Sequence, residues 1–357
     1  MPPPPIPDPP LPGTDLELIL EHTRPLWEEM RNQRIFITGG TGFFGTWLLS
    51  SFLHAQQALS LNAKATVLTR NPAQFATKAP RLALHPAITL LQGDTSNFSM
   101  PDGRFDFVLH AATDVATPAH SSTSSPLARY ASIADGTARV LEFAATHGTR
   151  KLLLTSSGAV YGRQPASLSH IPEDYSGAPD PLAPASAYGE AKRASELMCA
   201  LYAQQSQLQC KIARCFAFVG PGLPLDANFA IGNFIRDALR GQPIQIAGDG
   251  TTVRSYLYAA DLTIWLWTIL FSAPPLQAFN VGSEDSISLA ELARLTAARL
   301  QPQLPIHIAK SPAADAARER YVPSTQRSQQ QLHLRQTVSL TEAIRRTADW
   351  HGMQSSG

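Results

Sequence analysis

The segment Thr38-Gly39-Gly40-Thr41-Gly42-Phe43-Phe44-Gly45 follows a short apolar run and opens a stretch with helical periodicity. Gly39, Gly42 and Gly45 are spaced three residues apart. Backbone N–H groups at the start of a helix approach a pyrophosphate closely only where no Cβ intervenes, and the third glycine lets the helix pack tightly on the preceding strand. The spacing of the glycines, with a predicted strand before the loop and a predicted helix after it, favours a dinucleotide-binding loop over a tight structural turn.

Short apolar runs alternate with helical segments on either side of this loop. Strands are predicted at 34–38, 65–69, 88–92, 107–110, 151–155 and 211–215, and helices at 44–53, 132–146 and 188–207. Near-continuous apolar strands alternating with helices are typical of a parallel sheet covered on both faces. We therefore expect an α/β fold, a Rossmann-like doubly wound parallel sheet. After Gly220 the rhythm is lost, which indicates a smaller, irregular α/β substrate lobe.

Composition divides the chain further. Residues 1–13 are mostly proline and predict a disordered tail, because such a run cannot build a core. Residues 14–33 have an amphipathic pattern and are expected to form a helical extension. Residues 34–220 form the expected dinucleotide-binding Rossmann domain with the catalytic residues. Residues 221–350 mainly form the smaller lobe, although about 248–275 is expected to return to the Rossmann domain.

The overall composition excludes several classes of protein. A formal net charge of +1, from 29 Lys and Arg against 28 Asp and Glu, lacks the basic excess of a nucleic-acid binder. The longest apolar stretch, 264–271, is far shorter than the ~18 residues that span a bilayer. Three cysteines form no disulfide framework, and the ten histidines show no metal-binding spacing. We expect a reduced, cytoplasmic protein that binds no membrane, nucleic acid or metal.

Two positions bear on the choice of dinucleotide. A carboxylate at the end of the second strand binds the adenosine ribose hydroxyls and selects NAD, but here the strand ends in Thr69-Arg70. Arg70 is suited to a 2′-phosphate, which favours NADP; the alternative is a solvated arginine. Asp94, after the third strand, is placed to accept from the adenine amino group, and a plain turn aspartate is the alternative.

A phenol and an ammonium group lie four residues apart in Tyr188-Gly189-Glu190-Ala191-Lys192, on one face of the predicted helix. A nearby cation lowers a tyrosine pKa from its usual value of about 10, so Tyr188 is expected to exchange a proton with a substrate hydroxyl. Ser157 ends the fifth strand, and parallel sheets bind ligands outside the carboxyl ends of their strands. Ser157 is therefore expected to donate a hydrogen bond to a substrate oxygen, with simple turn chemistry as the alternative.

Over most of residues 34–350 the chain resembles the extended short-chain dehydrogenases/reductases of the NAD-dependent epimerase/dehydratase family. The shared motifs are TGGTGFFG at 38–45, GD at 93–94, HAA at 110–112, GT at 136–137, SSGAVYG at 156–162, YGEAK at 188–192, VGPG at 219–222 and GDGTTVRSYLYAAD at 248–261. The resemblance implies a cofactor lobe, a smaller lobe that holds a nucleoside-diphosphate sugar, and a homodimer.

The resemblance also implies roles for individual residues. Ser157, Tyr188 and Lys192 match the family's catalytic serine, tyrosine and lysine. Arg254 matches the contact to the substrate diphosphate, and Asn228 is expected to bind the substrate with Ser157 and Arg254. NAD or NADP is the expected cofactor. Its expected contacts are Gly39, Thr41, Gly42, Phe43, Phe44, Gly45, Arg70, Asp94, Thr95, His110, Ala111, Ala112, Thr155, Tyr188 and Lys192.

The family's reactions differ in the residues that follow the catalytic serine. Members that dehydrate or decarboxylate the sugar usually carry an acid there, whereas this chain has Gly158 and Ala159. The segment therefore resembles a nucleotide-sugar 4-epimerase, with an NADPH-dependent 4-keto-6-deoxy nucleotide-sugar reductase as the alternative. A 4,6-dehydratase, a decarboxylase or a non-catalytic dinucleotide-sensing regulator is less favoured.

Some positions depart from the family's pattern. Its usual asparagines appear as Ile133 and Ala217, so the substrate is expected to be bound differently from UDP-galactose. The run Arg318-Glu319-Arg320-Tyr321 resembles a segment that sometimes adds an arginine to the sugar diphosphate, but a solvated charge run is the favoured interpretation. Cys215, in an apolar strand, is expected to be a core residue.

Overall fold

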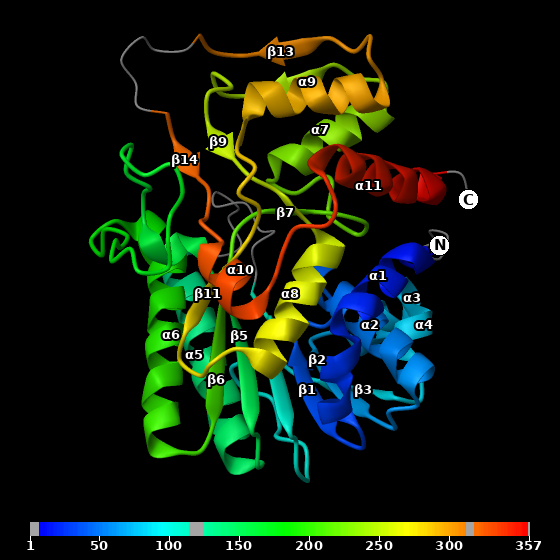
Figure 1. Cartoon of the computed structure of the whole chain (residues 1–357), viewed down its shortest axis with the longest axis vertical. Coiled ribbons are helices and arrows are strands. Elements are labelled where there is room, and N and C mark those ends of the chain that lie inside the picture. The colour runs from blue at the N-terminus through cyan, green and yellow to red at the C-terminus, as the bar shows by residue number, and fades with distance from the viewer. Residues whose placement is uncertain (1–6, 114–124, 312–317, 356–357) are drawn as a thin grey trace.

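The computed structural model describes residues 7–113, 125–311 and 318–355. A seven-stranded sheet forms its centre, in the order β11-β6-β5-β4-β1-β2-β3, and all neighbouring strands are parallel (Figure 1). The strands are β1 (Arg34–Thr38), β2 (Lys64–Thr69), β3 (Ile88–Gln92), β4 (Phe107–His110), β5 (Lys151–Ser157), β6 (Gln209–Cys215) and β11 (Ala278–Val281). The Rossmann-like α/β fold predicted from the sequence is confirmed, with β11 as an additional edge strand.

Helices cover both faces of this sheet because successive strand residues point to opposite sides. On one face, Phe36 and Val108 pack with Phe143 of α5, and α6 lies beside α5. On the other face, Ile35 and Ile37 join the core formed with α2 and α8. The helices are α2 (Phe43–Leu59), α5 (Pro126–Thr146), α6 (Ala187–Gln205) and α8 (Ala259–Ser272), and the short α3 (Pro72–Lys78) and α4 (Pro80–Ala83) precede β3.

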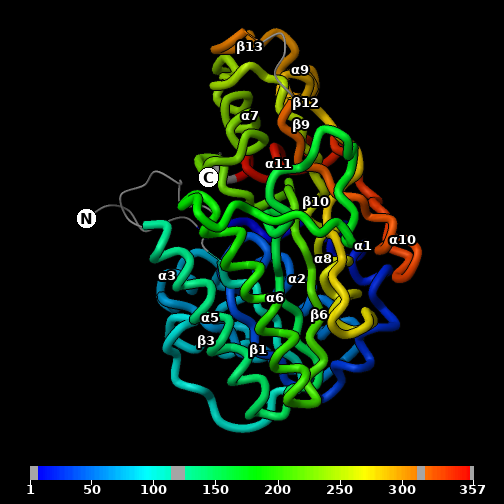
Figure 2. The backbone as a smooth tube through the Cα atoms, turned by 90° about the vertical axis from the view of Figure 1, so that its left-hand side faces the viewer, coloured from blue at the N-terminus to red at the C-terminus, as the bar shows by residue number. Residues whose placement is uncertain are grey.

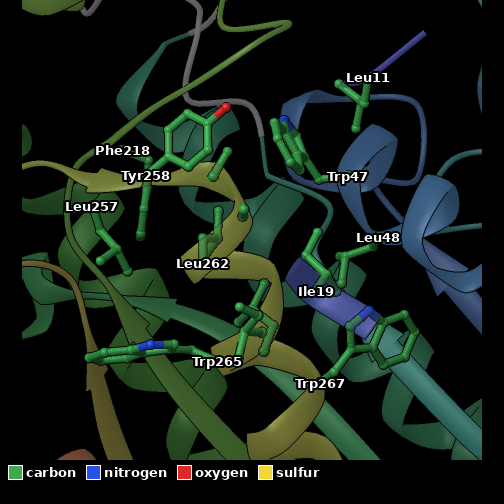
Figure 3. Packing of buried hydrophobic residues seen from close by; sticks show 14 of the residues in the cluster. Leu11, Ile19, Trp47, Leu48, Phe218, Leu257, Tyr258, Leu262, Trp265 and Trp267 are labelled. Atoms are coloured by element: carbon green, nitrogen blue, oxygen red, sulfur yellow. The ribbon is translucent and has the colours of Figure 1, made fainter. Parts of the chain in front are cut away.

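The α8 helix is apolar around its whole circumference, and such a helix needs cover on every side. It packs on β5 and β6, and the N-terminal extension covers its outer side. This extension consists of α1 (Gly13–Thr23) and a 3₁₀ helix, η1 (Arg24–Met30). Trp27 of η1 meets Trp267 of α8 with 4.7 Å between ring centroids. Figure 3 shows Ile19 of the extension between α8 and the side chain of Leu48.

The expectation of a disordered tail through residue 13 is wrong for its second half, and residues 1–6 lie outside the described residues. Leu11 is buried, and the Trp350 indole donates a hydrogen bond of 3.1 Å to the Pro10 carbonyl. The Asp8 amide donates to the Lys78 carbonyl at 2.8 Å. The burial of Leu11 and the backbone hydrogen bonds of Asp8 and Pro10 thus hold this segment on the rest of the protein, and composition alone does not predict such contacts.

A smaller lobe lies beyond one end of the central sheet (Figure 2). Its helices are α7 (Ala230–Leu239), α9 (Leu289–Leu300) and α11 (Leu340–Ser355), while α10 (Gln326–Leu332) packs near β11. Short strands form three small sheets: β8 (Ile244–Ile246) with β13 (Ile306–Ile308); β12 (Ile287–Ser288), β9 (Val253–Arg254) and β14 (Arg320–Tyr321); and β7 (Phe218–Val219) with β10 (Leu257–Tyr258). This lobe brings β14 close to the end of β5, where the Tyr321 hydroxyl lies 2.6 Å from where a Cβ on Gly158 would be.

Candidate active site

The glycine loop joins β1 to α2, and its three glycines have different roles. Gly39 has φ +73°, and a Cβ on it would lie 2.5 Å from the Ala111 carbonyl carbon. A Cβ on Gly45 would lie 2.3 Å from Gly40. At Gly42 a Cβ would meet only the Gly39 oxygen, at 3.5 Å, so this α-carbon faces open space at the start of α2. The loop thus offers bare backbone and a helix N-terminus to a pyrophosphate, and it fits a dinucleotide.

Thr41, Phe43 and Phe44 line the same turn, and Phe43 and Phe44 begin α2. The first N–H groups of a helix have no partner within the helix, so the backbone of these residues is available to an anion.

No described group of three or more His, Cys, Asp or Glu side chains is arranged to hold a metal ion. In the part of the chain that the structure describes, no helix is long and apolar enough to cross a membrane.

The His110 ring is buried between two threonine hydroxyls. It lies between the hydroxyls of Thr38, at 2.7 Å, and Thr137, at 3.2 Å. Burial lowers the pKa of His110 to about 3, so the ring is neutral. The Thr38 hydroxyl also accepts from the Ala112 amide at 3.2 Å, and the Thr155 hydroxyl donates to the His110 carbonyl at 3.1 Å. This network engages the backbone of residues 110–112 and holds it against the glycine loop, where a Cβ on Gly39 would meet Ala111.

Residues after β2 and β3 lie at the adenine side of the predicted cofactor site. Arg70 is exposed, and its side chain makes no hydrogen bond or ion pair with any described residue. The Asp94 carboxylate accepts from the amide and hydroxyl of Ser96, at 3.1 and 2.8 Å. The Thr95 hydroxyl lies 2.7 Å from where a Cβ on Gly136 would be. Asp94 therefore serves at least as a turn aspartate, and its role toward adenine stays a prediction.

Ser157, Tyr188 and Lys192 come together at the end of β5. Ser157 Oγ accepts a hydrogen bond from the Ala159 amide at 3.1 Å. Tyr188 and Lys192 occupy the first turns of α6, and the Ser157 hydroxyl is near enough to the Tyr188 phenol to lower its pKa against the effect of burial. Close approach of α6 permits this, since a Cβ on Gly189 would lie 2.8 Å from the Ala159 carbonyl oxygen. The three predicted catalytic residues thus share one site.

The protonation of this site differs from the sequence-based expectation. Burial raises the pKa of Tyr188 to about 12, although the Ser157 hydroxyl opposes the shift. Burial lowers the pKa of Lys192 to about 8. The Lys192 ammonium donates to Thr113 Oγ1 at 2.7 Å and to the Thr155 carbonyl at 2.8 Å. The expectation of a lowered Tyr188 pKa is wrong here, because desolvation of the phenol outweighs the lowering by the Ser157 hydroxyl and by the charge of Arg129.

The substrate contacts predicted from the resemblance are only partly brought together. Arg254 lies in β9, pairs with Glu319 at 2.6 Å and sits with its guanidinium 5.7 Å from the Tyr321 ring centroid. Asn228 is exposed in the segment just before α7, and no described contact joins it to Ser157 or Arg254. The roles of both residues toward a diphosphate stay predictions.

Sequence reasoning missed Tyr321. The expectation of a solvated charge run at 318–321 is wrong for its last two residues, which form β14 and pair with β9. From there the Tyr321 hydroxyl lies 2.6 Å from where a Cβ on Gly158, the residue after Ser157, would be. Cys215 also lies among these groups, and burial raises the pKa of its thiol to about 12, as suits a core residue rather than a nucleophile.

A carboxylate close to the catalytic residues is already engaged. Glu196 forms a two-point ion pair with Arg214, with a shortest N–O distance of 2.7 Å, and accepts from the Ser156 hydroxyl at 2.5 Å. Arg214 also donates to the Tyr161 hydroxyl at 2.8 Å. This partly buried pair stabilises the strand end, and it leaves Glu196 poorly suited to remove a proton from a substrate.

A dinucleotide loop beside a serine, a tyrosine and a lysine on a doubly wound sheet defines a nicotinamide-dependent enzyme of the short-chain dehydrogenase type. The chain belongs to the NAD dependent epimerase/dehydratase family, whose sequence model matches residues 35–282. Members of this family use NAD and act on nucleotide sugars, as the sequence motifs implied.

Individual relatives carry different activities. The chain is 28% identical over 315 residues to UDP-glucuronic acid decarboxylase 1 of Arabidopsis thaliana, covering 88% of this chain and 68% of the relative. A crystal structure of UDP-galactose 4-epimerase is similar at 26% identity and a TM-score of 0.70, covering 90% and 99% of the two chains. UDP-glucuronic acid 4-epimerase from Bacillus cereus, in complex with UDP-glucuronic acid and NAD, shares the fold at 20% identity and a TM-score of 0.73, with 89% and 98% covered.

Proposed function

We propose that the chain is a nucleotide-sugar 4-epimerase. It oxidises the C4 hydroxyl of a nucleoside-diphosphate sugar to a ketone and reduces that ketone from the opposite face. The observation that carries this proposal is the grouping of Ser157, Tyr188 and Lys192 beside the glycine loop, with no acidic side chain at positions 158 and 159. This minimal set moves one proton at one oxygen, which is what oxidation at C4 requires.

Each of the three residues has one task in this chemistry. Tyr188 removes the proton of the 4-hydroxyl and later returns it. Ser157 donates a hydrogen bond to the same substrate oxygen. Lys192, held by Thr113 and Thr155, places a positive charge near the phenol and toward the nicotinamide ribose. A bound nicotinamide dinucleotide supplies reversible hydride exchange with C4.

The decarboxylase and dehydratase activities of relatives demand a further acid or base. A Cβ on Gly158 would lie 2.6 Å from the Tyr321 hydroxyl and 2.6 Å from the Phe216 ring, so no acidic side chain fits at this position. Ala159 carries no ionisable group, and Glu196 is bound to Arg214. These contacts favour a reaction that needs no second acid, and an epimerase is one.

A 4-keto-sugar reductase is the second candidate, and the free Arg70 side chain among the described residues favours it. An epimerase regenerates its cofactor in every turnover and retains it, whereas a reductase consumes NADPH. Denaturing the purified protein and identifying the released dinucleotide by mass separates the two. We expect about one NAD per chain, unchanged in Arg70→Ala. A protein that carries no dinucleotide, binds NADPH reversibly and loses this binding in Arg70→Ala would support the reductase.

We also propose that the protein is a homodimer in the cytoplasm. The outer faces of α5 and α6, which run side by side in Figure 2, carry large exposed apolar side chains. These are Leu127, Tyr130, Leu197 and Leu201, between 38% and 77% exposed. A second copy of the chain would remove this apolar surface from water.

A further inference from the structure

The Lys192 ammonium has three N–H donors and no acceptor, and two oxygens of the chain engage it. Thr113 Oγ1, in the segment after β4, lies 2.7 Å from Lys192 Nζ, and the Thr155 carbonyl oxygen, in β5, lies 2.8 Å from it. The lysine is only 3% exposed, so water competes little for these bonds. Two acceptors on different strands fix the orientation of the ammonium group and leave its third N–H for a ligand.

The Thr113 hydroxyl accepts from Lys192 and donates elsewhere. It donates its own proton to the Ala112 carbonyl oxygen at 2.7 Å. A hydroxyl has one proton and two lone pairs, so a lone pair is what it offers to the lysine. The proton arrangement around Thr113 is therefore settled by its two partners, and it suits a charged ammonium group.

The backbone next to Thr113 is tied to the glycine loop. The Ala112 amide donates to Thr38 Oγ1 at 3.2 Å, and the Ala111 amide donates to the Thr38 carbonyl oxygen at 3.2 Å. Thr38 directly precedes Gly39, where a Cβ would lie only 2.5 Å from the Ala111 carbonyl carbon. A continuous set of contacts thus joins the loop that fits a pyrophosphate to the lysine of the catalytic group.

We propose, on the basis of the C4 chemistry above, that Thr113 is a positioning residue for Lys192. Its hydroxyl holds the ammonium group in place relative to the glycine loop, and it leaves the third N–H for the ribose of a bound nicotinamide dinucleotide. The same hydrogen bond stabilises the charged form of the lysine, which a neutral side chain at position 113 without an acceptor could not do.

The charge of Lys192 depends on few other groups. Burial lowers the pKa of Lys192 to about 8. Burial also lowers the pKa of His110, on β4, to about 3 and raises the pKa values of Cys215, on β6, and Tyr188, on α6, to about 12, so all three are uncharged near neutral pH. The Glu196 carboxylate favours the ammonium form, but it is bound to an arginine. The two accepting oxygens are therefore important for keeping Lys192 charged.

Thr113→Val and Thr113→Ser test this role as a matched pair, because valine keeps the shape of threonine without the hydroxyl and serine keeps the hydroxyl. NADH is titrated by fluorescence into protein stripped of dinucleotide, across the neutral and alkaline range. Without the acceptor the ammonium form is less favoured, so Lys192 loses its proton at a lower pH. We expect the alkaline loss of NADH affinity, near pH 8 in the wild type, to move about one pH unit lower in Thr113→Val and to recover in Thr113→Ser.

Turnover provides a second readout, with the nucleotide sugar that turns over among UDP-, dTDP- and GDP-hexoses. At a pH above both alkaline limbs, kcat of Thr113→Val should be about tenfold lower than that of the wild type, as a shift of one unit requires. KM for the sugar should stay within about twofold. Thr113→Ala removes the same hydroxyl with a smaller side chain, and it should shift both pH profiles in the same direction even if valine disturbs the fold.

Thr296→Val is the matched control, because the Thr296 hydroxyl is also buried and donates to a carbonyl, that of Leu292 at 2.9 Å, but lies in α9 of the smaller lobe. Its pH profiles should coincide with those of the wild type. Alkaline limbs of Thr113→Val and Thr113→Ala that coincide with that of the wild type, or a Thr113→Ser variant that behaves like Thr113→Val, would overturn the positioning role. The NADH titration needs no substrate, so its outcome is independent of whether the epimerase proposal fails.

Discussion

Tyr188→Phe is expected to lower kcat by about 10³-fold, within the range of 10²–10⁴ that general acid–base catalysis contributes. The phenol hydroxyl is the group that exchanges a proton with the 4-hydroxyl, and phenylalanine preserves the ring but not the proton. The dinucleotide content should remain near that of the wild type, because the glycine loop lies on β1 and α2. Single-turnover kinetics and the mass of released dinucleotide measure the two effects separately.

Tyr256→Phe serves as the control. Burial raises the pKa of Tyr256 to about 12, as it does for Tyr188, but Tyr256 does not interact with Ser157. This control separates the effect on kcat of losing any buried phenol from the effect of losing the phenol next to Ser157. Wild-type turnover in Tyr188→Phe would refute the proposed proton transfer.

Gly42→Val is expected to abolish dinucleotide binding without unfolding the protein. Its φ of −89° is open to valine, and a Cβ there meets no protein atom except the Gly39 oxygen at 3.5 Å. The added side chain would instead fill the space of the pyrophosphate. We expect the affinity for NADH to fall at least about 100-fold, or ~2.8 kcal/mol, in a fluorescence titration. The melting temperature of protein stripped of dinucleotide should not change.

Two other glycines provide the comparison. Gly39→Val should destabilise the fold itself, because its φ is +73° and its Cβ would lie 2.5 Å from the Ala111 backbone. Gly13→Val, at a position with no atom within 4 Å of the Cβ, should bind NADH as the wild type does. If Gly42→Val bound NADH as tightly as the wild type, the dinucleotide would have to bind at a site other than this loop.

Most strands of the central sheet were predictable because they are short apolar runs, and β1, β4 and β5 are buried on both faces. β1 and β3 have the predicted bounds, and β2 begins one residue earlier than predicted. β11 (Ala278–Val281) was missed, since four residues with a buried asparagine among them carry too little pattern. The packed segment at 7–12 was missed for a related reason, because its contacts depend on α3 and α11 rather than on its own composition.

The grouping of the three residues that we propose to be catalytic was predictable because their spacing is local. Tyr188 and Lys192 lie one helical turn apart, and Ser157 ends a strand. Tyr321 was not predictable in this way, since its place depends on the pairing of β14 with β9. The pKa of Tyr188 was misjudged for the same reason. Its spacing from Lys192 is visible in the sequence, but the burial that raises the pKa of the phenol arises only in the folded chain.

The mass of the product tests the central proposal most directly. The purified protein, without added cofactor, is incubated with UDP-, dTDP- and GDP-linked hexoses and hexuronic acids, and the products are separated and weighed by mass spectrometry. The proposal predicts a product of unchanged mass that differs from the substrate only in the configuration at C4. A product lighter by carbon dioxide or by water would contradict it, because either loss requires the second acid that positions 158 and 159 lack.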